Sequence, residues 1–492
     1  MADNSMNKKY LYSIVLVAVL GGLLFGYDTA VISGAEKGLQ AFFLGAQDFQ
    51  YTDFIHGITC SSALIGCVIG ALLSGWLANR IGRKWSLSVA GTLFLVSALG
   101  SAHPEFPFHL NSVPTMTILN SFNYYRIIGG MGVGLASAIC PMYIGEVAPA
   151  GKRGQLVSWN QFAIIFGQLV VYFVNFIILG SHENPLIESI GKGVSQVMEG
   201  SDVWTISRGW RYMFASEAII AALFTLLVCF IPESPRYLAM KGKDSRALDV
   251  LSRINGQTKA QEILSDIKST VTLRKERLFA YGWLVVFIGV MLSVFQQVVG
   301  INAVLYYAPR IFGDMGMTNP MFNTVMMGVV NILFTLVAIF TVEKWGRKPL
   351  LITGSLGMAL GAFGVATTFG VDGLQLVTML SIMLYSASFM FSWGPICWVL
   401  IAEIFPNTIR GTAVAIAVAA QWIFNFVVSS TFVPMFNMHI TQGDNFGHWF
   451  TYGLYGVMCI VAALFVWRLV PETKGKTLEE MSRLWKSKTK NQ

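Results

Sequence analysis

The chain has 492 residues, of which 54% are hydrophobic and only 12% are charged. A soluble domain carries about 25% charged residues, so this composition excludes a fold whose only solvent is water. The net charge of +8 raises the question of a nucleic-acid partner, which the placement of the basic residues answers.

Apolar runs of about 20 residues recur along the whole chain, and each is long enough to cross about 30 Å of hydrocarbon. They predict an all-α membrane protein with twelve spans. The first span follows Lys8 and Lys9 but precedes no small-residue cleavage site, so we interpret it as a retained helix and not as a signal peptide. The predicted spans lie near residues 10–30, 55–78, 84–102, 120–146, 155–179, 210–231, 279–309, 321–343, 349–371, 374–402, 411–435 and 448–470.

Basic residues gather on one side of these spans. Of 34 lysines and arginines, 28 fall before the first span, after the even-numbered spans or in the C-terminal segment. This asymmetry follows the positive-inside rule and predicts that both termini are cytoplasmic. We therefore expect a multi-pass plasma-membrane protein whose partner is the lipid bilayer, with no nucleic acid. Short tails and the lack of glycosylation sequons favour a bacterial inner membrane.

All six cysteines lie in predicted spans, and the chain shows neither metal-ligand spacing nor a phosphate-binding glycine loop or catalytic triad. The sequence therefore indicates neither a metal, nor another cofactor, nor an enzyme.

The chain uses one six-span unit twice. The segment NRIGRKWSL at 79–87 matches EKWGRKPLL at 343–351, and GEVAPAGKRG at 145–154 matches AEIFPNTIRG at 402–411. A third pair, PESPRYL at 232–238 and PETKGKTLEE at 471–480, follows spans 6 and 12. Parallel halves with a central site are typical of one class of secondary transporter. We predict an N-terminal half at 1–231, a cytoplasmic helical linker at 232–278, a C-terminal half at 279–471 and a cytoplasmic tail at 472–492.

Side-chain amides recur at membrane depth, where a polar group needs a partner that lipid does not supply. Amides both donate and accept hydrogen bonds, and tryptophan covers an apolar C–H face, so this set suits an uncharged polyol. The alternative is hydrogen bonding between helices, which is worth about 0.6 kcal/mol each. The groups that carry the polyol interpretation are Gln161, Gln168, Asn175, Gln296, Gln297, Asn302, Asn331, Trp393, Trp398, Gln421, Trp422 and Asn425.

Three ionisable residues lie within the spans of the first half. A charged side chain at this depth costs free energy, so a protein keeps one only where it is paired, protonated or functional. The three residues are Asp28, Arg126 and Glu217. Ionised Asp28 is expected to pair with Arg126, and protonation to break the pair and free the helices. A purely structural pair is the alternative.

Together, the paired GRK turns, the two Glu-x6-Arg-Gly turns, PESPR and PETKGKTLEE resemble the signature set of the sugar porter family of the major facilitator superfamily. The resemblance extends over nearly the whole chain and implies the major facilitator fold. It implies that Asp28 is the coupling carboxylate of a proton symporter. It also implies sugar contacts for Gln168, Gln296, Gln297, Asn302, Asn331, Trp398, Gln421 and Trp422, with Phe25 and Tyr307 close by.

Charges of both signs recur at the predicted cytoplasmic helix ends of both halves. They could latch the halves together when the central site faces outward, and the family resemblance implies such an inner network, with Glu233 included. Topology charges and helix caps are the simpler alternative. The predicted gate residues are Arg83, Glu146, Arg153, Glu233, Arg347, Glu403 and Arg410.

The leading hypothesis is a monomeric transporter that imports an aldose, D-xylose first, together with a proton. A uniporter of the same fold is the nearest alternative, and Asp28 argues against it. A sugar sensor is a third possibility, although sensors of this fold usually add long cytoplasmic tails and only about 20 residues follow Pro471.

Overall fold

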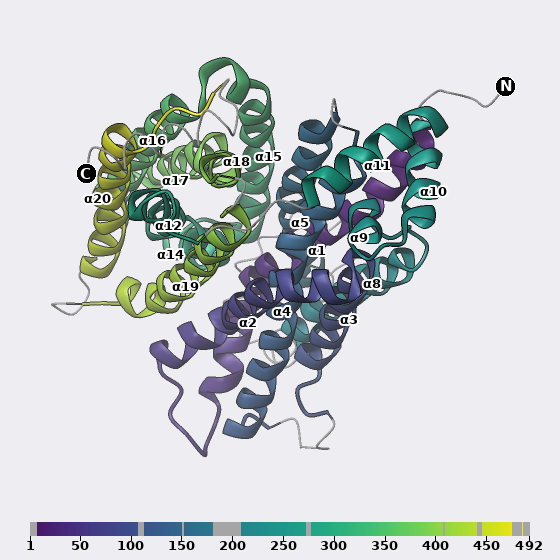
Figure 1. Ribbon diagram of the computed structural model, residues 1–492. Coiled ribbons are helices and arrows are strands. Elements are labelled where there is room, and N and C mark those ends of the chain that lie inside the picture. The colour runs from purple at the N-terminus through teal and green to yellow at the C-terminus, as the bar shows by residue number, and fades with distance from the viewer. Residues whose placement is uncertain are drawn as a thin grey trace.

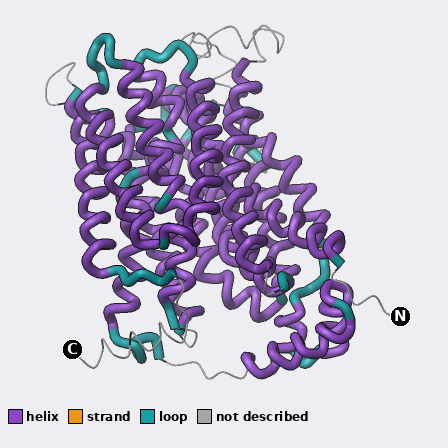
Figure 2. Tube along the Cα trace, turned by 90° about the horizontal axis from the view of Figure 1, so that it is seen from above, coloured by secondary structure: helices purple, strands orange, loops and turns teal. Residues whose placement is uncertain are grey.

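The computed structural model describes residues 7–106, 113–149, 152–180, 208–271, 277–406, 409–439, 445–474 and 485. Every regular element in these ranges is a helix, and twelve stretches are long and apolar enough to cross a membrane, as predicted. The helices run roughly parallel, with loops at the two ends of the bundle (Figure 2). Most of the predicted tail at 472–492, and residues 272–276 of the predicted linker, lie outside the described residues.

Six long helices form the first half, drawn from purple to teal in Figure 1. They are α1 (Lys8–Leu44), α2 (Asp53–Ile81), α3 (Arg83–Ala102), α4 (Met116–Val147), α5 (Arg153–Gly180) and α8 (Trp210–Val228).

Three short helices follow and pack beside the first half (Figure 1). They are α9 (Pro235–Met240), α10 (Asp244–Asn255) and α11 (Gln257–Val271). Leu251 and Ile254 of α10 are buried, and their spacing of three residues places them on one face of the helix. The backbone N–H of Asn7 donates to the carbonyl of Ile254 at 3.0 Å, so the start of α1 is fixed against this linker.

The second half, green to yellow in Figure 1, repeats the six spans with two of them interrupted. The seventh span is divided into α12 (Trp283–Val298), α13 (Ile301–Tyr306) and α14 (Ala308–Asp314), and the tenth into α17 (Gln375–Phe391) and α18 (Trp393–Ile404). The others are α15 (Pro320–Trp345), α16 (Arg347–Thr368), α19 (Arg410–Phe436) and α20 (Phe446–Leu469).

Glycine explains the break in the seventh span. Gly300 has a φ of +89°, a left-handed conformation that an L side chain rarely adopts. A Cβ built there would also lie 2.4 Å from the ring of Tyr455. In the tenth span the helix is interrupted at Ser392, two residues before Gly394-Pro395.

The repeat is visible at atomic detail where α2 meets α3 and α15 meets α16. Gly82 and Gly346 have φ values of +99° and +91°, and each turn faces a glutamate, Glu233 and Glu472 respectively. We call the helix ends at these two turns the inner end, which is the predicted cytoplasmic side, and the opposite ends the outer end.

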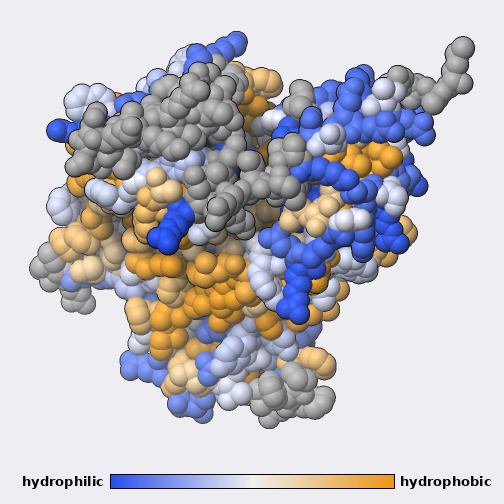
Figure 3. All heavy atoms as spheres, in the orientation of Figure 1, coloured by the Kyte–Doolittle hydropathy of each residue, from blue (hydrophilic) through white to orange (hydrophobic). Residues whose placement is uncertain are grey.

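Large apolar side chains cover the outside of the bundle between these two ends. Leu72, Phe340 and Trp467 are 56%, 72% and 64% exposed. Figure 3 shows hydrophobic residues gathered across the middle of the molecule, with hydrophilic residues over the linker helices at upper right. Such a surface requires lipid as its solvent.

Close backbone approach joins the outer parts of α2 and α19, one helix from each half. A Cβ built at Gly57 would lie 2.2 Å from the carbonyl oxygen of Ser430, so a larger residue would separate these helices. Asn437 donates to Asp53 at 2.8 Å one turn further out. The outer ends of the two halves are therefore in contact.

Candidate functional site

A buried ion pair ties α1 to α4 inside the first half. Arg126 donates through Nη1 to Asp28 Oδ1 at 2.6 Å and through Nη2 to the backbone carbonyl of Asp28 at 3.1 Å. Both residues are at most 1% exposed, and the guanidinium lies 5.1 Å from the ring centroid of Phe214 on α8. The predicted partnership of Asp28 with Arg126 is therefore present in the structure.

Glu217 on α8 completes this cluster without joining the pair. It is fully buried, and neither of its carboxyl oxygens has a hydrogen-bond partner among the described residues, nor has Asp28 Oδ2. Glu217 interacts electrostatically with both Asp28 and Arg126, so two carboxyl groups share one arginine. A buried anion without a partner is costly, so this cluster has a place for a proton.

The amides of α12 and α13 form a connected cluster with α18 and α19. Gln296 donates to the carbonyl of Trp393 at 3.0 Å and accepts a hydrogen bond from Gln421. Asn302 donates to Gln297 at 2.6 Å across the Gly300 break. The left-handed glycine therefore brings Gln297 and Asn302, five residues apart in sequence, into direct contact.

Four buried polar atoms near the contact between the halves have no hydrogen-bond partner among the described residues. They are two acceptors, the Oε1 atoms of Gln168 and Gln421, and two donors, Asn331 Nδ2 and Trp422 Nε1. A hydroxyl group both donates and accepts, so a polyol matches this set of atoms. An anion would match only the donors, and all four atoms belong to uncharged side chains.

Aromatic residues border this set. Phe25 of α1 lies 5.6 Å from Trp422 of α19, measured between ring centroids, so these rings meet across the two halves. Tyr307 instead donates to the carbonyl of Ser429 at 3.4 Å and stacks on Phe432 at 5.0 Å. Trp398 of α18 is only partly buried.

Five of the seven residues predicted for the inner gate form two matching clusters, one at the inner end of each half. Arg83 pairs with Glu146 at 2.8 Å, and the carboxylate of Glu233 accepts from the backbone N–H of Arg83 at 2.8 Å. Ser234 donates its hydroxyl to Glu146.

In the second half, Arg347 pairs with Glu403 at 2.8 Å, and Glu472 accepts from the backbone N–H of Arg347 at 3.0 Å. Thr473 donates to Glu403 at 2.6 Å. These pairs lie within a half. Arg153 is exposed, and Arg410 donates to the carbonyl of Phe405 at 3.4 Å. A latch between the halves through these residues remains a prediction.

Sequence reasoning missed Glu472, although its signal was available. The match between PESPR and PETKG pairs Glu472 with Glu233, which was predicted. Burial raises the pKa of Glu233, and its bonds to backbone N–H groups oppose this only in part. In Glu472 burial also acts upward, but the N–H groups of Lys474, Arg347 and Lys348 outweigh it and lower the pKa.

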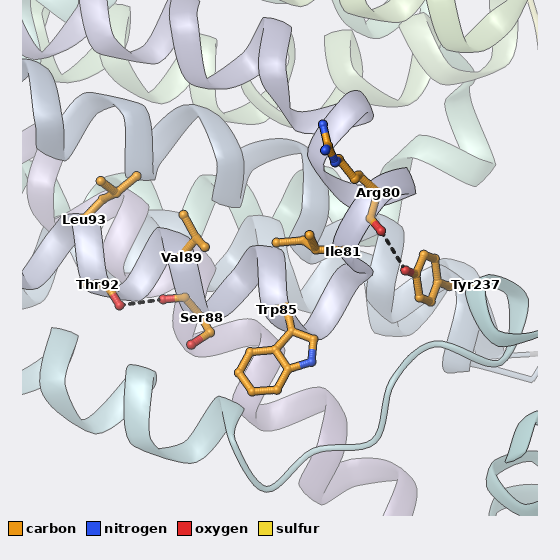
Figure 4. Close-up of a pocket in the computed structure, with 8 residues that line it drawn as sticks. All are labelled: Arg80, Ile81, Trp85, Ser88, Val89, Thr92, Leu93 and Tyr237. Carbon is orange, nitrogen blue, oxygen red and sulfur yellow. Dashed lines mark hydrogen bonds between the residues drawn. The ribbon is translucent and has the colours of Figure 1, made fainter. Parts of the chain in front are cut away.

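A pocket of about 640 Å³ opens at the inner end of α2 and α3, beside α9 (Figure 4). It is lined by residues such as Arg80, Trp85 and Tyr237, and the Tyr237 hydroxyl donates to the carbonyl of Arg80 at 3.0 Å. None of the predicted sugar residues lines it, and its lining comes from the first half and the linker alone. The Tyr237 hydrogen bond holds α9 against α2 here. This pocket is therefore not the central site.

A model of the family described as "Sugar (and other) transporter" matches residues 14–485. The chain belongs to this family. It is a sugar transporter and a multi-pass membrane protein, and not an enzyme. The match also confirms the resemblance on which the predicted fold rested.

Two curated relatives extend over nearly the full length. The D-xylose-proton symporter of Escherichia coli K12 is 49% identical over 99% of this chain and 98% of its own. The glucose facilitated diffusion protein of Zymomonas mobilis is 37% identical over 96% of this chain and 97% of its own.

Among solved structures, the inward open conformation of the xylose transporter XylE from E. coli is 48% identical. It matches with a TM-score of 0.82 over 96% of this chain and all of that one. The fold is therefore the major facilitator fold.

Proposed function

We propose that this sugar transporter imports an aldose, D-xylose first, together with one proton by alternating access. The observation that carries the proposal is the cluster of Asp28, Arg126 and Glu217, in which two buried carboxyl groups share one buried arginine. The relative at 49% identity, a D-xylose-proton symporter, supports the same substrates. The proposed setting is a bacterial inner membrane, with both termini cytoplasmic and the monomer as the working unit.

The proton acts on the Asp28–Arg126 contact. While Asp28 is ionised, the bond at 2.6 Å ties α1 to α4. A proton on Asp28 removes the charge attraction and frees α1, and Glu217 then supplies the anion that Arg126 needs. The cluster can thus exchange a proton without leaving the buried arginine unpaired.

The sugar occupies the contact between the halves. Its hydroxyls bond to Gln168, Gln421, Asn331 and Trp422, whose free atoms are two acceptors and two donors. Gln296, Gln297 and Asn302 contribute from the interrupted seventh span, and Phe25, Tyr307 and Trp398 enclose the site. Since α5 belongs to one half and α15 and α19 to the other, a bound sugar connects the halves.

The inner clusters would then control access from the cytoplasm. Arg83, Glu146 and Glu233 hold the helix ends of one half in place, and Arg347 and Glu403 hold those of the other. In the state that faces outward, Arg153 and Arg410 approach the acidic groups of the opposite half.

Uniport is the second candidate, because a relative at 37% identity is a glucose facilitated diffusion protein. External pH after a sugar pulse separates the two. De-energised, lightly buffered cells without other xylose carriers should show alkalinisation on addition of D-xylose. Xylose entry without a pH change would establish uniport, and no xylose entry would direct the assay to D-glucose, L-arabinose and D-galactose.

A further inference from the structure

A second buried charge cluster lies at the outer end of the contact between the halves. Glu36 on α1, His56 on α2 and Arg310 on α14 are 1%, 0% and 6% exposed. Neither the sugar site nor the proton cluster uses these residues. Charged groups buried to this degree are costly unless they are paired, so their partners decide what the cluster does.

The carboxylate of Glu36 is shared between two partners. Its Oε1 accepts from Nη2 of Arg310 and lies 2.8 Å from Nε2 of His56. The other ring nitrogen of His56 is 3.0 Å from the hydroxyl of Tyr51. The imidazole is therefore held at both nitrogens, and it fixes the position of the carboxylate.

Arg310 has a second acceptor on the same helix as Glu36. Its Nη2 also donates to Oε1 of Gln40, one turn after Glu36 on α1. An arginine side chain stays protonated in proteins. The guanidinium is therefore a permanent cation that depends on α1 for its counter-charge.

The contact crosses from one half to the other. Glu36 and His56 belong to the first half, and Arg310 belongs to the second. A second pair nearby, Lys37 with Asp314, also crosses, but it measures 3.8 Å and its side chains are 31% and 36% exposed. Exposed pairs of this kind are worth little because water and salt screen them.

We propose that Glu36, His56 and Arg310 form an outer charge latch that holds the outer ends of the halves together and opens in each transport cycle. The proposal rests on the alternating access proposed above. Glu36 lies eight residues beyond Asp28 on α1, about 12 Å along the helix. The latch is therefore separate from the proton cluster, which lies within the first half.

The geometry explains how the latch can open without leaving a bare charge in the protein. When α14 moves away from α1, Arg310 enters water, while Glu36 keeps His56 because both residues are in the same half. His56 is thus a positioning residue. Without Arg310, by contrast, the closed state would bury the carboxylate with only a histidine beside it.

Distances between spin labels at the outer end test the proposal. After Cys229→Ser removes the exposed native thiol, the pair Thr52→Cys and Met438→Cys places labels beside Asp53 and Asn437, which bond at 2.8 Å. Double electron–electron resonance then reports the populations of closed and open outer ends, with no sugar present.

In this background Glu36→Gln or Arg310→Gln should raise the ratio of open to closed populations by at least about tenfold, because each leaves one buried charge unpaired. The double variant should change the ratio of open to closed populations less than either single variant does, because it removes both charges together. Arg310→Lys keeps the charge, so its ratio of open to closed populations should lie between those of wild type and Arg310→Gln. It replaces Arg310→Gln in the test if that variant does not fold.

The matched control is Lys37→Gln, which removes the neighbouring exposed pair and should leave the populations nearly unchanged. Unchanged distances in the Glu36 and Arg310 variants would overturn the latch, and so would an equal shift in the control. The measurement uses neither xylose nor a pH gradient. Failure of xylose-proton coupling would therefore leave this result intact, and failure of the latch would leave the coupling intact.

Discussion

Replacement of Asp28 by asparagine tests the coupling most directly. The change removes the anion that lies 2.6 Å from Arg126 but keeps the size of the side chain. We expect sugar exchange to survive and proton coupling to disappear, because the variant has no carboxyl group at this position to bind and release a proton.

The stability cost should be smaller than for an isolated buried pair. Removal of one partner from a buried pair typically costs about 3–5 kcal/mol. Here Arg126 keeps its bond to the backbone carbonyl of residue 28 at 3.1 Å, and the unpartnered carboxyl of Glu217 is available to replace the lost anion. We therefore expect a loss of about 1–3 kcal/mol, which leaves the protein folded.

The transport effect is measured as an accumulation ratio. With one proton per sugar, a membrane potential of about 100 mV supplies about 2.3 kcal/mol, or roughly fifty-fold accumulation. Asp28→Asn should reduce the accumulation ratio to about one, since uncoupled transport only equilibrates the sugar. The assay compares accumulation and external alkalinisation after a D-xylose pulse with counterflow exchange in the same cells.

The control is Glu105→Gln, which breaks a different and slightly more exposed pair of the first half, Glu105 with Arg211 at 2.6 Å. It should lower stability without changing the accumulation ratio. If Asp28→Asn still accumulates xylose and still takes up protons, Asp28 is a structural residue and the coupling lies elsewhere. Loss of exchange as well as coupling would show that the pair is needed for the movement itself.

Four further outcomes follow from the site and the residues that support it. Gln296→Ala should weaken sugar binding by about tenfold or more, since a hydrogen-bonded amide contributes about 1–3 kcal/mol when its loss leaves partners unpaired; a dissociation constant within twofold of wild type would contradict this. Gly300→Ala, at a φ of +89°, should lower the Tm by several degrees, whereas Gly453→Ala, with nothing within 4 Å of a new Cβ, should not; equal Tm values would refute the strain argument. Glu472→Gln should lower the Tm more at pH 7 than at pH 4, because a lowered pKa gives stability above the ordinary value of 4.5 that is lost as pH falls. Glu233→Gln should lower the Tm less at pH 7 than at pH 4, because the pKa of Glu233 is raised and its contribution to stability is lost as pH rises. Thermal melts in which the two variants show the opposite pH dependences would contradict these pKa shifts.

The spans and the repeat could be predicted from sequence because both depend on local patterns. Hydropathy predicts which stretches enter lipid, and the doubled turns predict the matching Gly82 and Gly346 geometry. The end of the first span could not be predicted in this way. It was placed near residue 30, but α1 continues to Leu44 because its polar Glu36 and Lys37 find partners on α14.

Among the site residues, the pairing of Asp28 with Arg126 was predictable because an ion in the first half had few possible partners. The outer cluster was not, since Glu36 and Arg310 lie 274 residues apart in the sequence (310 − 36) and come into contact only when the halves do. Contacts between halves carry no local pattern, so only the folded chain reveals them.

Helix α1 connects the two proposed charge sites and gives them different roles. Asp28 holds α1 to α4 within the first half, so its protonation can change how this helix sits without any movement of the second half. Glu36 holds the same helix to α14 across the contact, so its release requires the halves to separate. A proton at the first site therefore alters the helix that carries the second. If the two sites are energetically coupled through α1, Asp28→Asn should change the spin-label populations of wild type but not those of the Glu36→Gln, Arg310→Gln double variant. Equal shifts in both backgrounds would show that the two sites act independently.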